Sequence, residues 1–135
     1  MSIVVDASVA VAWLIPEVDT PTAIEIRRRV VEEGATTPQH WRIEVYNALL
    51  MSARRKRYDL RRLDRDLSAL SMLPVATDEE TWERAWGDGA KLAIEHKLTA
   101  YDAAYLELAR RTRLPLATFD GGLTKAARRI GVEVI

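Results

Sequence analysis

The sequence predicts an α/β fold, with helices packed on both faces of a central, mainly parallel sheet. Short β-branched or apolar segments alternate with stretches of helical periodicity along the whole chain. No repeat, linker or low-complexity segment interrupts this alternation, and 135 residues suffice for one hydrophobic core but not for two ordinary ones. We therefore expect a single domain that spans residues 1–135.

The composition excludes several functional classes. The chain is 48% hydrophobic and 30% charged, as globular proteins are, and its net charge of zero argues against indiscriminate coating of nucleic acid. Without cysteine it has no disulfide framework, thiolate metal site or cysteine nucleophile, which fits a reducing compartment. The uncharged run over 7–16 follows an acid and resembles neither a signal peptide nor a membrane span. We expect a cytoplasmic protein without membrane association.

The first elements are predicted to be a buried strand over 2–6 and a short helix over 7–14 that Pro16 ends. A second helix, capped by Thr20 or Thr22, is expected to reach residue 33, where Gly34 closes it. Its inward residues are expected to be Ala23, Ile26, Val30 and Val31.

A short extended segment over 35–38 precedes a longer helix over 39–57. Helical spacing places one stripe of that helix inward, formed by Trp41, Val45, Ala48, Leu49 and Ser52. A further helix is predicted over 60–71, with Leu63, Leu67 and Leu70 inward, and a short strand over 73–76.

Asp78 is predicted to cap one helix over 79–96, in which Trp82 and Trp86 stand one turn apart. Such a pair is usually core, although two tryptophans in a small domain can also form an interface. The remaining elements are expected to be a helix beginning near residue 99, a buried strand over 114–119, a helix over 123–129 and a final strand over 131–135. His40 and His96 belong to no motif and are treated as ordinary polar residues.

Four acids occupy positions that a parallel sheet brings together. Asp6 and Asp120 each follow a buried strand, and the carboxyl ends of parallel strands meet at one edge of a sheet. Glu44 lies beside the apolar stripe of its helix, and Asp102 stands among small and apolar residues. An ionised carboxylate in such surroundings is costly unless it is paired or bound to a cation.

Each acid also has a local explanation. Asp6 can cap the helix that follows it, and Asp120 precedes glycine, as in many turns. Glu44 can pair with a nearby arginine, Arg42 or Arg54. Asp102 fits a capping box that begins at Thr99, an interpretation of about equal weight when that acid is taken alone.

Taken together, the four acids predict a metal site. Converging carboxylates repel one another and raise each other's pKa unless a divalent cation neutralises them. Oxygen-only ligation selects Mg²⁺ or Mn²⁺ over zinc and suits phosphodiester hydrolysis, in which the metal activates a water and a carboxylate accepts its proton. Ser8 and Thr118 each stand two positions from a strand-end acid. Supporting hydrogen bonds to the acids or to water, and simple strand-end packing, explain these two residues equally well.

Basic residues crowd into Arg54, Arg55, Lys56 and Arg57, and again at Arg61, Arg62 and Arg65. Such runs are most often solvated helix faces. Beside a metal-holding cluster, however, a basic segment can hold phosphates. The run from Arg54 to Arg57 is therefore the candidate substrate-binding segment.

The order of these motifs resembles the PIN-domain family, in particular the small VapC toxins of prokaryotic type II toxin–antitoxin pairs. The resemblance covers nearly the whole chain. It is carried by VVDAS at 4–8, the segment 38–49 with its glutamate, TAYDAAYL at 99–106 and ATFD at 117–120. All four acids of the family pattern are present.

The resemblance implies a three-layer α/β/α PIN sandwich and a Mg²⁺- or Mn²⁺-dependent endoribonuclease that cuts RNA to inhibit translation. Its catalytic and metal-binding residues would be Asp6, Glu44, Asp102 and Asp120, with Asp6 and Asp102 the foremost metal ligands. A VapB-like antitoxin would block the site, and a homodimer would surround it with a basic rim.

Other classes fit less well. A phosphorelay receiver requires adjacent acids after its first strand, whereas Ala7 follows Asp6, and an aspartyl phosphatase requires a second acid where Ser8 stands. The remaining alternative is a non-catalytic RNA- or protein-binding module with the same fold.

Overall fold

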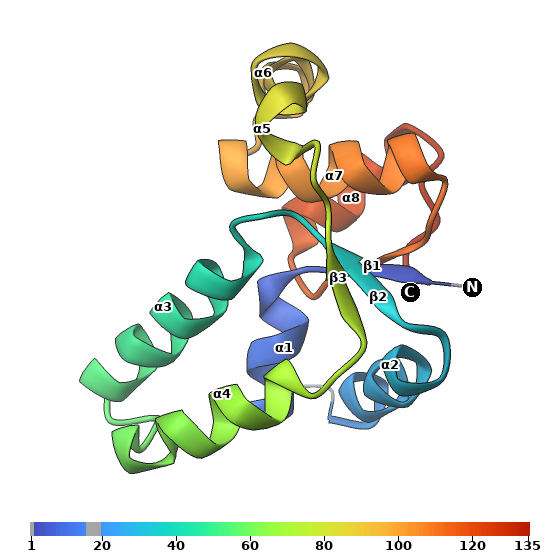
Figure 1. The fold of residues 1–135 in the computed structure, drawn as a ribbon. Coiled ribbons are helices and arrows are strands. Elements are labelled where there is room, and N and C mark those ends of the chain that lie inside the picture. The colour runs from blue at the N-terminus through green and yellow to red at the C-terminus, as the bar shows by residue number, and fades with distance from the viewer. Residues whose placement is uncertain (1, 16–19) are drawn as a thin grey trace.

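A four-stranded sheet forms the centre of the protein, whose computed structural model describes residues 2–15 and 20–135 (Figure 1). The strands lie in the order β3-β2-β1-β4, and every adjacent pair is parallel. They are β1 (Ile3–Val5), β2 (Ala35–Thr37), β3 (Val75–Thr77) and β4 (Leu116–Ala117). The predicted α/β fold with a parallel sheet is therefore confirmed.

Helices cover both faces of the sheet. The first four α-helices are α1 (Ala7–Leu14), α2 (Thr20–Glu33), α3 (Trp41–Arg54) and α4 (Leu63–Ser71), the last preceded by the 3₁₀ turn η1 (Leu60–Arg62). The others are α5 (Thr81–Arg84), the π-turn η2 (Ala85–Gly89), α6 (Ala90–His96), α7 (Ala100–Thr112) and α8 (Gly121–Arg129). In Figure 1, α7 and α8 lie above the sheet and α1 and α2 below it.

The alternation of β1 side chains builds one core on each face. Val4 packs in the cluster that contains residues of α7 and α8, whereas Ile3 and Val5 pack with residues of α2. All three are buried, which explains why this strand is a continuous apolar run rather than an alternating one. Three layers result, as the sequence predicts.

The first half of the chain follows its predicted pattern with small departures. Helix α1 has the expected bounds, although Pro16, predicted to end it, lies outside the described residues. Gly34 closes α2 in the left-handed conformation that glycine adopts without strain (φ 80°). Two expectations were wrong: Val31 is 57% exposed, and α2 already begins at Thr20, so neither Thr20 nor Thr22 precedes it as a cap.

The predicted single helix over 79–96 is broken. Gly87 has non-helical angles (φ −104°, ψ −109°), so α5 and α6 are separated by the π-turn η2. Asp78 is not the cap of α5; its carboxylate binds Arg111 and the Thr81 hydroxyl. Trp82 and Trp86 are 61% and 95% exposed, so of the two interpretations of this pair the structure excludes core packing.

The C-terminal elements are shorter or shifted. Residues 131–135 do not form a full strand, because only one parallel bridge joins Val134 to Leu116 of β4. Helix α8 begins at Gly121, two residues earlier than predicted, directly after Asp120. Within residues 2–15 and 20–135, no helix has the length and apolar character needed to cross a membrane.

Candidate active site

Asp6 lies at the carboxyl end of β1, where it caps α1 by accepting a hydrogen bond from the Val9 N–H (3.3 Å). Its side chain is buried, and the hydroxyls of Ser8 and Thr118 donate to its two oxygens, each at 2.5 Å. Burial raises the pKa of Asp6, while these hydrogen bonds act in the opposite direction and the charge of Asp102 adds to the rise. Ser8 and Thr118 thus fix the orientation of this carboxylate.

The same two hydroxyls join the ends of β1 and β4. The Ser8 oxygen accepts from the Phe119 N–H (3.0 Å), and the Thr118 oxygen accepts from the Asp120 N–H (3.0 Å). Because Thr118 also donates to Asp6, one hydroxyl links the two strand-end acids. Strands that are far apart in sequence therefore present Asp6 and Asp120 at one edge of the sheet.

Glu44 lies in the first turn of α3 and reaches towards α7. The Tyr105 hydroxyl donates to its Oε1 (2.8 Å), and the Nε2 of His40 lies 3.4 Å from the same oxygen. The arginines suggested by sequence, Arg42 and Arg54, are not its partners. Burial raises the pKa of Glu44; the hydrogen bond from Tyr105 lowers it, and the charges of Asp102 and Asp6 raise it further.

Asp102 stands in the first turn of α7, where Thr99 is the N-cap and accepts a hydrogen bond from the Asp102 N–H (3.1 Å). The predicted capping role of Thr99 is confirmed. Burial raises the pKa of the Asp102 carboxyl, the charge of Asp120 raises it further, and the Thr99 hydroxyl opposes this. Thr99 thus provides one half of the predicted capping box. Within the described structure no backbone N–H donates to the Asp102 carboxylate, which interacts instead with the Thr99 hydroxyl and with the charge of Asp120.

Asp120 caps α8 by accepting a hydrogen bond from the Leu123 N–H (2.7 Å). It acts as a helix cap rather than as part of an isolated turn, and its side chain is exposed. All four predicted acids thus lie at the edge of the sheet where the strands end, each at the beginning of a helix.

The four carboxylates interact electrostatically. Asp102 affects Asp6 and Glu44, and Asp120 affects Asp102. Within the described part of the chain, no lysine or arginine forms an ion pair with any of the four; only His40 approaches Glu44. The cluster therefore carries negative charge that its own side chains do not neutralise.

This donor set fits a hard divalent cation in chemistry, since it consists of carboxylate oxygens whose mutual repulsion a cation would relieve. Among the residues that the structure describes, however, no three acidic or histidine side chains surround a common point at bonding distance. Binding an ion would require the carboxylates to draw closer together.

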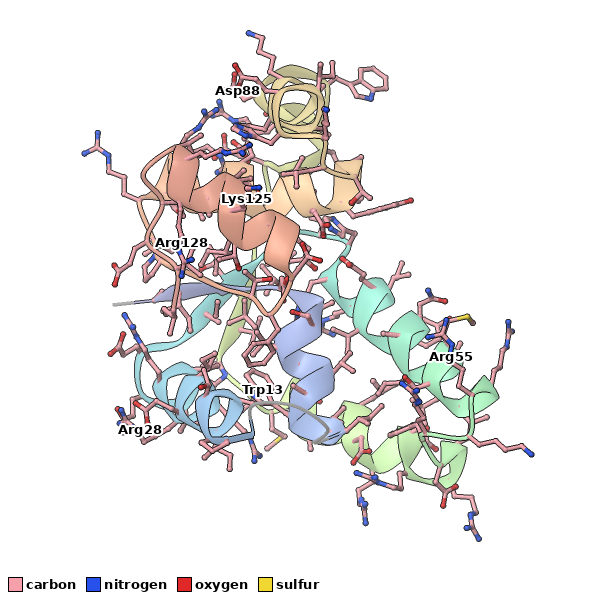
Figure 2. The ribbon with its side chains drawn as sticks, turned by 180° about the vertical axis from the view of Figure 1, so that it is seen from behind. Trp13, Arg28, Arg55, Asp88, Lys125 and Arg128 are labelled. Atoms are coloured by element: carbon pink, nitrogen blue, oxygen red, sulfur yellow. The ribbon has the colours of Figure 1, made fainter. Side chains whose placement is uncertain are left out.

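The predicted substrate-binding run is not close to these acids. Glu44 lies in the first turn of α3 and Arg54 in its last, and ten residues of helix separate them by about 15 Å. Figure 2 shows Arg55 at the end of α3 that is remote from the sheet. The structure brings the four acids, Ser8 and Thr118 to one region but leaves Arg54 to Arg57 outside it.

Two residues of this region were not singled out from sequence. Tyr105 is buried and bonds Glu44, and the buried His40 packs edge-on against Tyr105, with ring centroids 5.2 Å apart. Their spacing could have indicated this, because residues three or four apart lie on the same face of a helix. His40 is four residues before Glu44, and Tyr105 is three residues after Asp102. Burial lowers the pKa of His40, which favours a neutral imidazole beside the acids.

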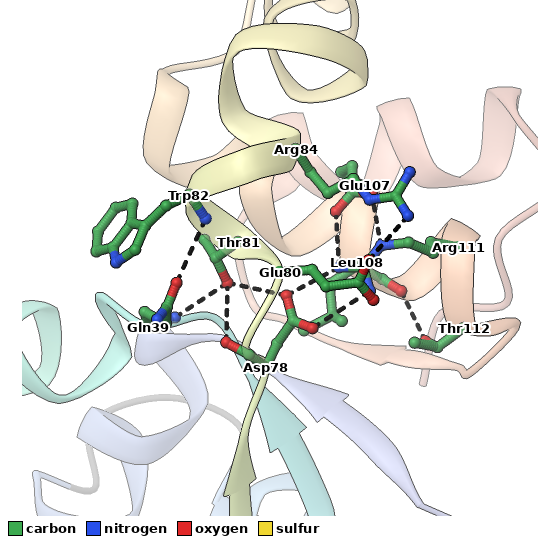
Figure 3. Close-up of polar contacts among 10 residues, drawn as sticks. All are labelled: Gln39, Asp78, Glu80, Thr81, Trp82, Arg84, Glu107, Leu108, Arg111 and Thr112. Carbon is green, nitrogen blue, oxygen red and sulfur yellow. Dashed lines mark hydrogen bonds and ion pairs between the residues drawn. The ribbon is translucent and has the colours of Figure 1, made fainter.

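A partly buried ionic cluster holds α7, the helix that carries Asp102, against the segment that joins β3 to α5 (Figure 3). Arg111 binds Glu107 through Nε (2.8 Å) and Asp78 through Nη2 (2.8 Å), and a longer bond reaches Glu80 (3.2 Å). The Thr81 hydroxyl donates to Asp78 (2.9 Å). Arg111 therefore joins two elements that are separate in sequence.

A second set of contacts extends from this cluster towards Glu44. The Gln39 N–H donates to the Thr81 oxygen (3.2 Å), and the Gln39 side-chain oxygen accepts from the Trp82 N–H (3.3 Å) (Figure 3). Gln39 directly precedes His40 at the start of α3. The segments that carry Asp102 and Glu44 are thus attached to the same connection.

Comparison with known proteins identifies the family. The model of the PIN domain matches residues 3–129. The chain belongs to the PIN domain family. Comparison with curated protein sequences finds no significant match.

Several solved structures resemble this PIN domain, and two of them are described here. PAE2754 from Pyrobaculum aerophilum is 26% identical, with a TM-score of 0.70 over 99% of this chain and 83% of the other. VapC20 from Mycobacterium tuberculosis, described as a toxin that cleaves the sarcin-ricin loop, is 21% identical, with a TM-score of 0.58 over 93% of this chain and 95% of the other. Because VapC20 is only 21% identical, its similarity to this chain shows a shared fold.

Proposed function

We propose that this PIN domain is a Mg²⁺- or Mn²⁺-dependent endoribonuclease, the toxin of a VapBC-type toxin–antitoxin pair. The observation that carries the proposal is the meeting of four carboxylates, without a lysine or arginine partner among the described residues, at one edge of a parallel sheet. Membership of the PIN family and the shared fold with VapC20, which is described as a toxin that cleaves the sarcin-ricin loop, support it.

Asp6 and Asp102 would be the foremost metal ligands, with Glu44 and Asp120 completing the set. A bound divalent cation supplies a water of lowered pKa and stabilises the charge that develops on the leaving oxygen. The protein's contribution is orientation: Ser8 and Thr118 hold Asp6.

Two further side chains have distinct parts in this arrangement. Tyr105 holds Glu44 through its hydroxyl. Asp120 is exposed and uses only Oδ2 in its cap, so within the described chain its Oδ1 has no hydrogen-bond partner. This free oxygen is the one with which Asp120 would complete the set of metal ligands.

The proposed partners are RNA, a VapB-like antitoxin and a second copy of the chain. Exposed apolar side chains on α5, η2 and α6, namely Trp82, Trp86 and Ile94, support a protein partner, because such residues seldom gather on a monomer's surface. Light scattering after size exclusion tests the homodimer. Arg54 to Arg57, at the far end of α3, remain candidate contacts for a distant part of the RNA.

The test is cleavage of total cellular RNA by purified protein with Mg²⁺ or Mn²⁺, with excess EDTA, and with the variant Asp6→Asn. The matched control is Asp64→Asn, which removes an exposed acid from the first turn of α4, away from the site. We expect cleavage by the wild type and the control only, and only with metal. Cleavage that persists in EDTA or in Asp6→Asn contradicts the proposal.

The alternative is a non-catalytic RNA- or protein-binding module. It is favoured by one observation: among the described residues, no three potential ligands surround a common point. Absence of both cleavage and Mn²⁺ binding in well-folded protein would favour this alternative.

A further inference from the structure

A polar cavity of about 320 Å³ lies between the C-terminal end of α6 and the length of α8. Three cations line it, together with one acid, Glu95. Lys97 directly follows α6, and Lys125 and Arg129 belong to α8. The three cations are exposed, and none of them forms an ion pair with an acid in residues 2–15 and 20–135. We call these three residues and His96 the basic pocket.

His96 gives the basic pocket an unsatisfied polar group. Its side chain is only 10% exposed, yet neither ring nitrogen has a hydrogen-bond partner within the described structure. The nearest acidic oxygen, Oε2 of Glu95, is 3.7 Å from Nε2, beyond hydrogen-bonding distance. Both ring nitrogens lie beneath the surface of the cavity. Because buried polar groups in folded proteins nearly always have a partner, ordered water included, the imidazole has donor capacity for a group that enters from the side of the cavity.

The basic pocket adjoins the acids through the first turn of α8. Gly122 lines the cavity, and a Cβ atom placed on it would lie 3.4 Å from Oδ2 of Asp120. Along the axis of α8, Lys125 lies about 7.5 Å and Arg129 about 13.5 Å beyond Asp120. Figure 2 shows Lys125 on α8, on the side of the helix turned towards the viewer. The cations therefore form a row that leads away from the acidic cluster.

We infer that the basic pocket binds backbone phosphates of the RNA strand on one side of the cleaved bond, with His96 donating a hydrogen bond to a phosphate oxygen. This inference rests on the proposed function. A row of cations beside a phosphate-cleaving site suits a polyanion whose charges repeat along a chain. An acidic protein segment would have no reason to follow α8 towards Asp120, so RNA is the ligand that the placement favours.

The experiment measures binding separately from cleavage. Single-stranded RNA is titrated in EDTA against the cleavage-deficient Asp6→Asn protein, and fluorescence anisotropy is recorded over a range of salt concentrations. The test variant adds K97Q, K125Q and R129Q. The matched control adds R27Q, K91Q and R113Q, which remove three exposed cations elsewhere; Arg113, like Lys97, has a positive φ.

At about 0.7 per phosphate contact on a single strand, the test variant should reduce the slope of log K against log salt by about 2, which is roughly a hundredfold loss of affinity at 0.1 M salt. The control should leave the slope unchanged. Equal effects of the two variants would overturn the inference. The inference would also be overturned if RNA affinity fell only in the variant R54Q/R55Q/K56Q. The same holds if the test variant bound polyglutamate, an acidic polypeptide, less tightly than the wild type but bound RNA equally well.

Two further results separate the inference from the function on which it rests. Metal-dependent RNA cleavage by the wild type, with RNA binding unaffected in the test variant, overturns the basic pocket alone, whereas absence of any RNA cleavage or binding by the wild type overturns both. The ring ¹⁵N resonances of His96 provide a direct readout. They should shift when RNA is added, and unchanged resonances at saturating RNA would contradict the assigned hydrogen bond.

Discussion

Replacing Arg111 with methionine should destabilise the protein more than any surface substitution. Arg111 makes two-pronged contacts with both Asp78 and Glu107, through donor–acceptor distances of 2.8 to 3.2 Å. The side chains of these acids are only 8% and 4% exposed. Methionine fills a similar volume but leaves two buried carboxylates without a cation.

Removing one partner of a buried ion pair costs about 3–5 kcal/mol, mainly because the remaining charge is buried and unpaired. For 135 residues the entropy of unfolding is about 0.28 kcal/mol/K, so the melting temperature should fall by roughly 10–18 °C. Urea denaturation at pH 7 gives the free energy of unfolding directly. The double variant Arg111→Met, Glu107→Gln should recover part of the loss, because it removes one of the buried charges.

The control is Arg28→Met, which breaks the contacts of an exposed arginine with Glu25 and Glu32 on α2. It should barely change the melting temperature, because exposed ion pairs contribute little. A loss in Arg111→Met no larger than in the control would refute the argument. A double variant less stable than Arg111→Met would refute it as well, since the cost would then come from packing rather than from charge.

Three further predictions concern pH and the site. Burial would raise the pKa of Asp78, but hydrogen bonds from Arg111 and Thr81 outweigh it and hold the pKa below its usual range. The stability that this adds is present above the unfolded pKa of about 3.9 and is lost as pH falls through the folded pKa. Urea titrations should therefore show that the difference in free energy of unfolding between wild type and Arg111→Met becomes smaller below about pH 4. Asp102→Asn should melt in EDTA at or above the wild-type temperature, because burial and the charge of Asp120 both oppose ionisation of Asp102; a clear loss of stability would mean that the carboxylate serves chiefly the helix cap. Tyr105→Phe should cost about 1–3 kcal/mol in urea denaturation, because Glu44 loses its donor. The loss should largely vanish when Glu44→Met is already present, because methionine has no oxygen to accept the hydrogen bond.

Local patterns in the sequence were sufficient for much of the fold and for the positions of the acids. The β-branched run of β1 predicts a strand because both faces of that strand are buried. The alternation of strands and helices predicts a parallel sheet. Asp6 and Asp120 were expected at one edge because the carboxyl ends of parallel strands meet there. The structure connects them through Thr118.

Features that depend on distant partners were not predictable from sequence. Asp78 had the position of a helix cap, but its partner Arg111 lies 33 residues away. The break at Gly87 follows from a glycine that an uninterrupted helix also tolerates at a cost of about 1 kcal/mol, and with that break Trp82 and Trp86 face outward.

The surroundings of the two histidines were also not predictable from sequence. Neither His40 nor His96 belongs to a motif, yet His40 is packed between Glu44 and Tyr105 through contacts of α3 with α7. His96 lines a cavity whose other wall is α8. Their surroundings come from tertiary packing, which the spacing of residues in one chain segment does not encode.

Calorimetric titration of Mn²⁺ into the metal-free protein tests the central claim, that Asp6, Glu44, Asp102 and Asp120 form one cation site. Wild-type protein and Asp64→Asn should bind Mn²⁺ equally, whereas Asp6→Asn, Glu44→Gln, Asp102→Asn and Asp120→Asn should each weaken binding while the protein stays folded. The absence of Mn²⁺ binding by the wild type, or binding that none of the four substitutions weakens, would contradict it.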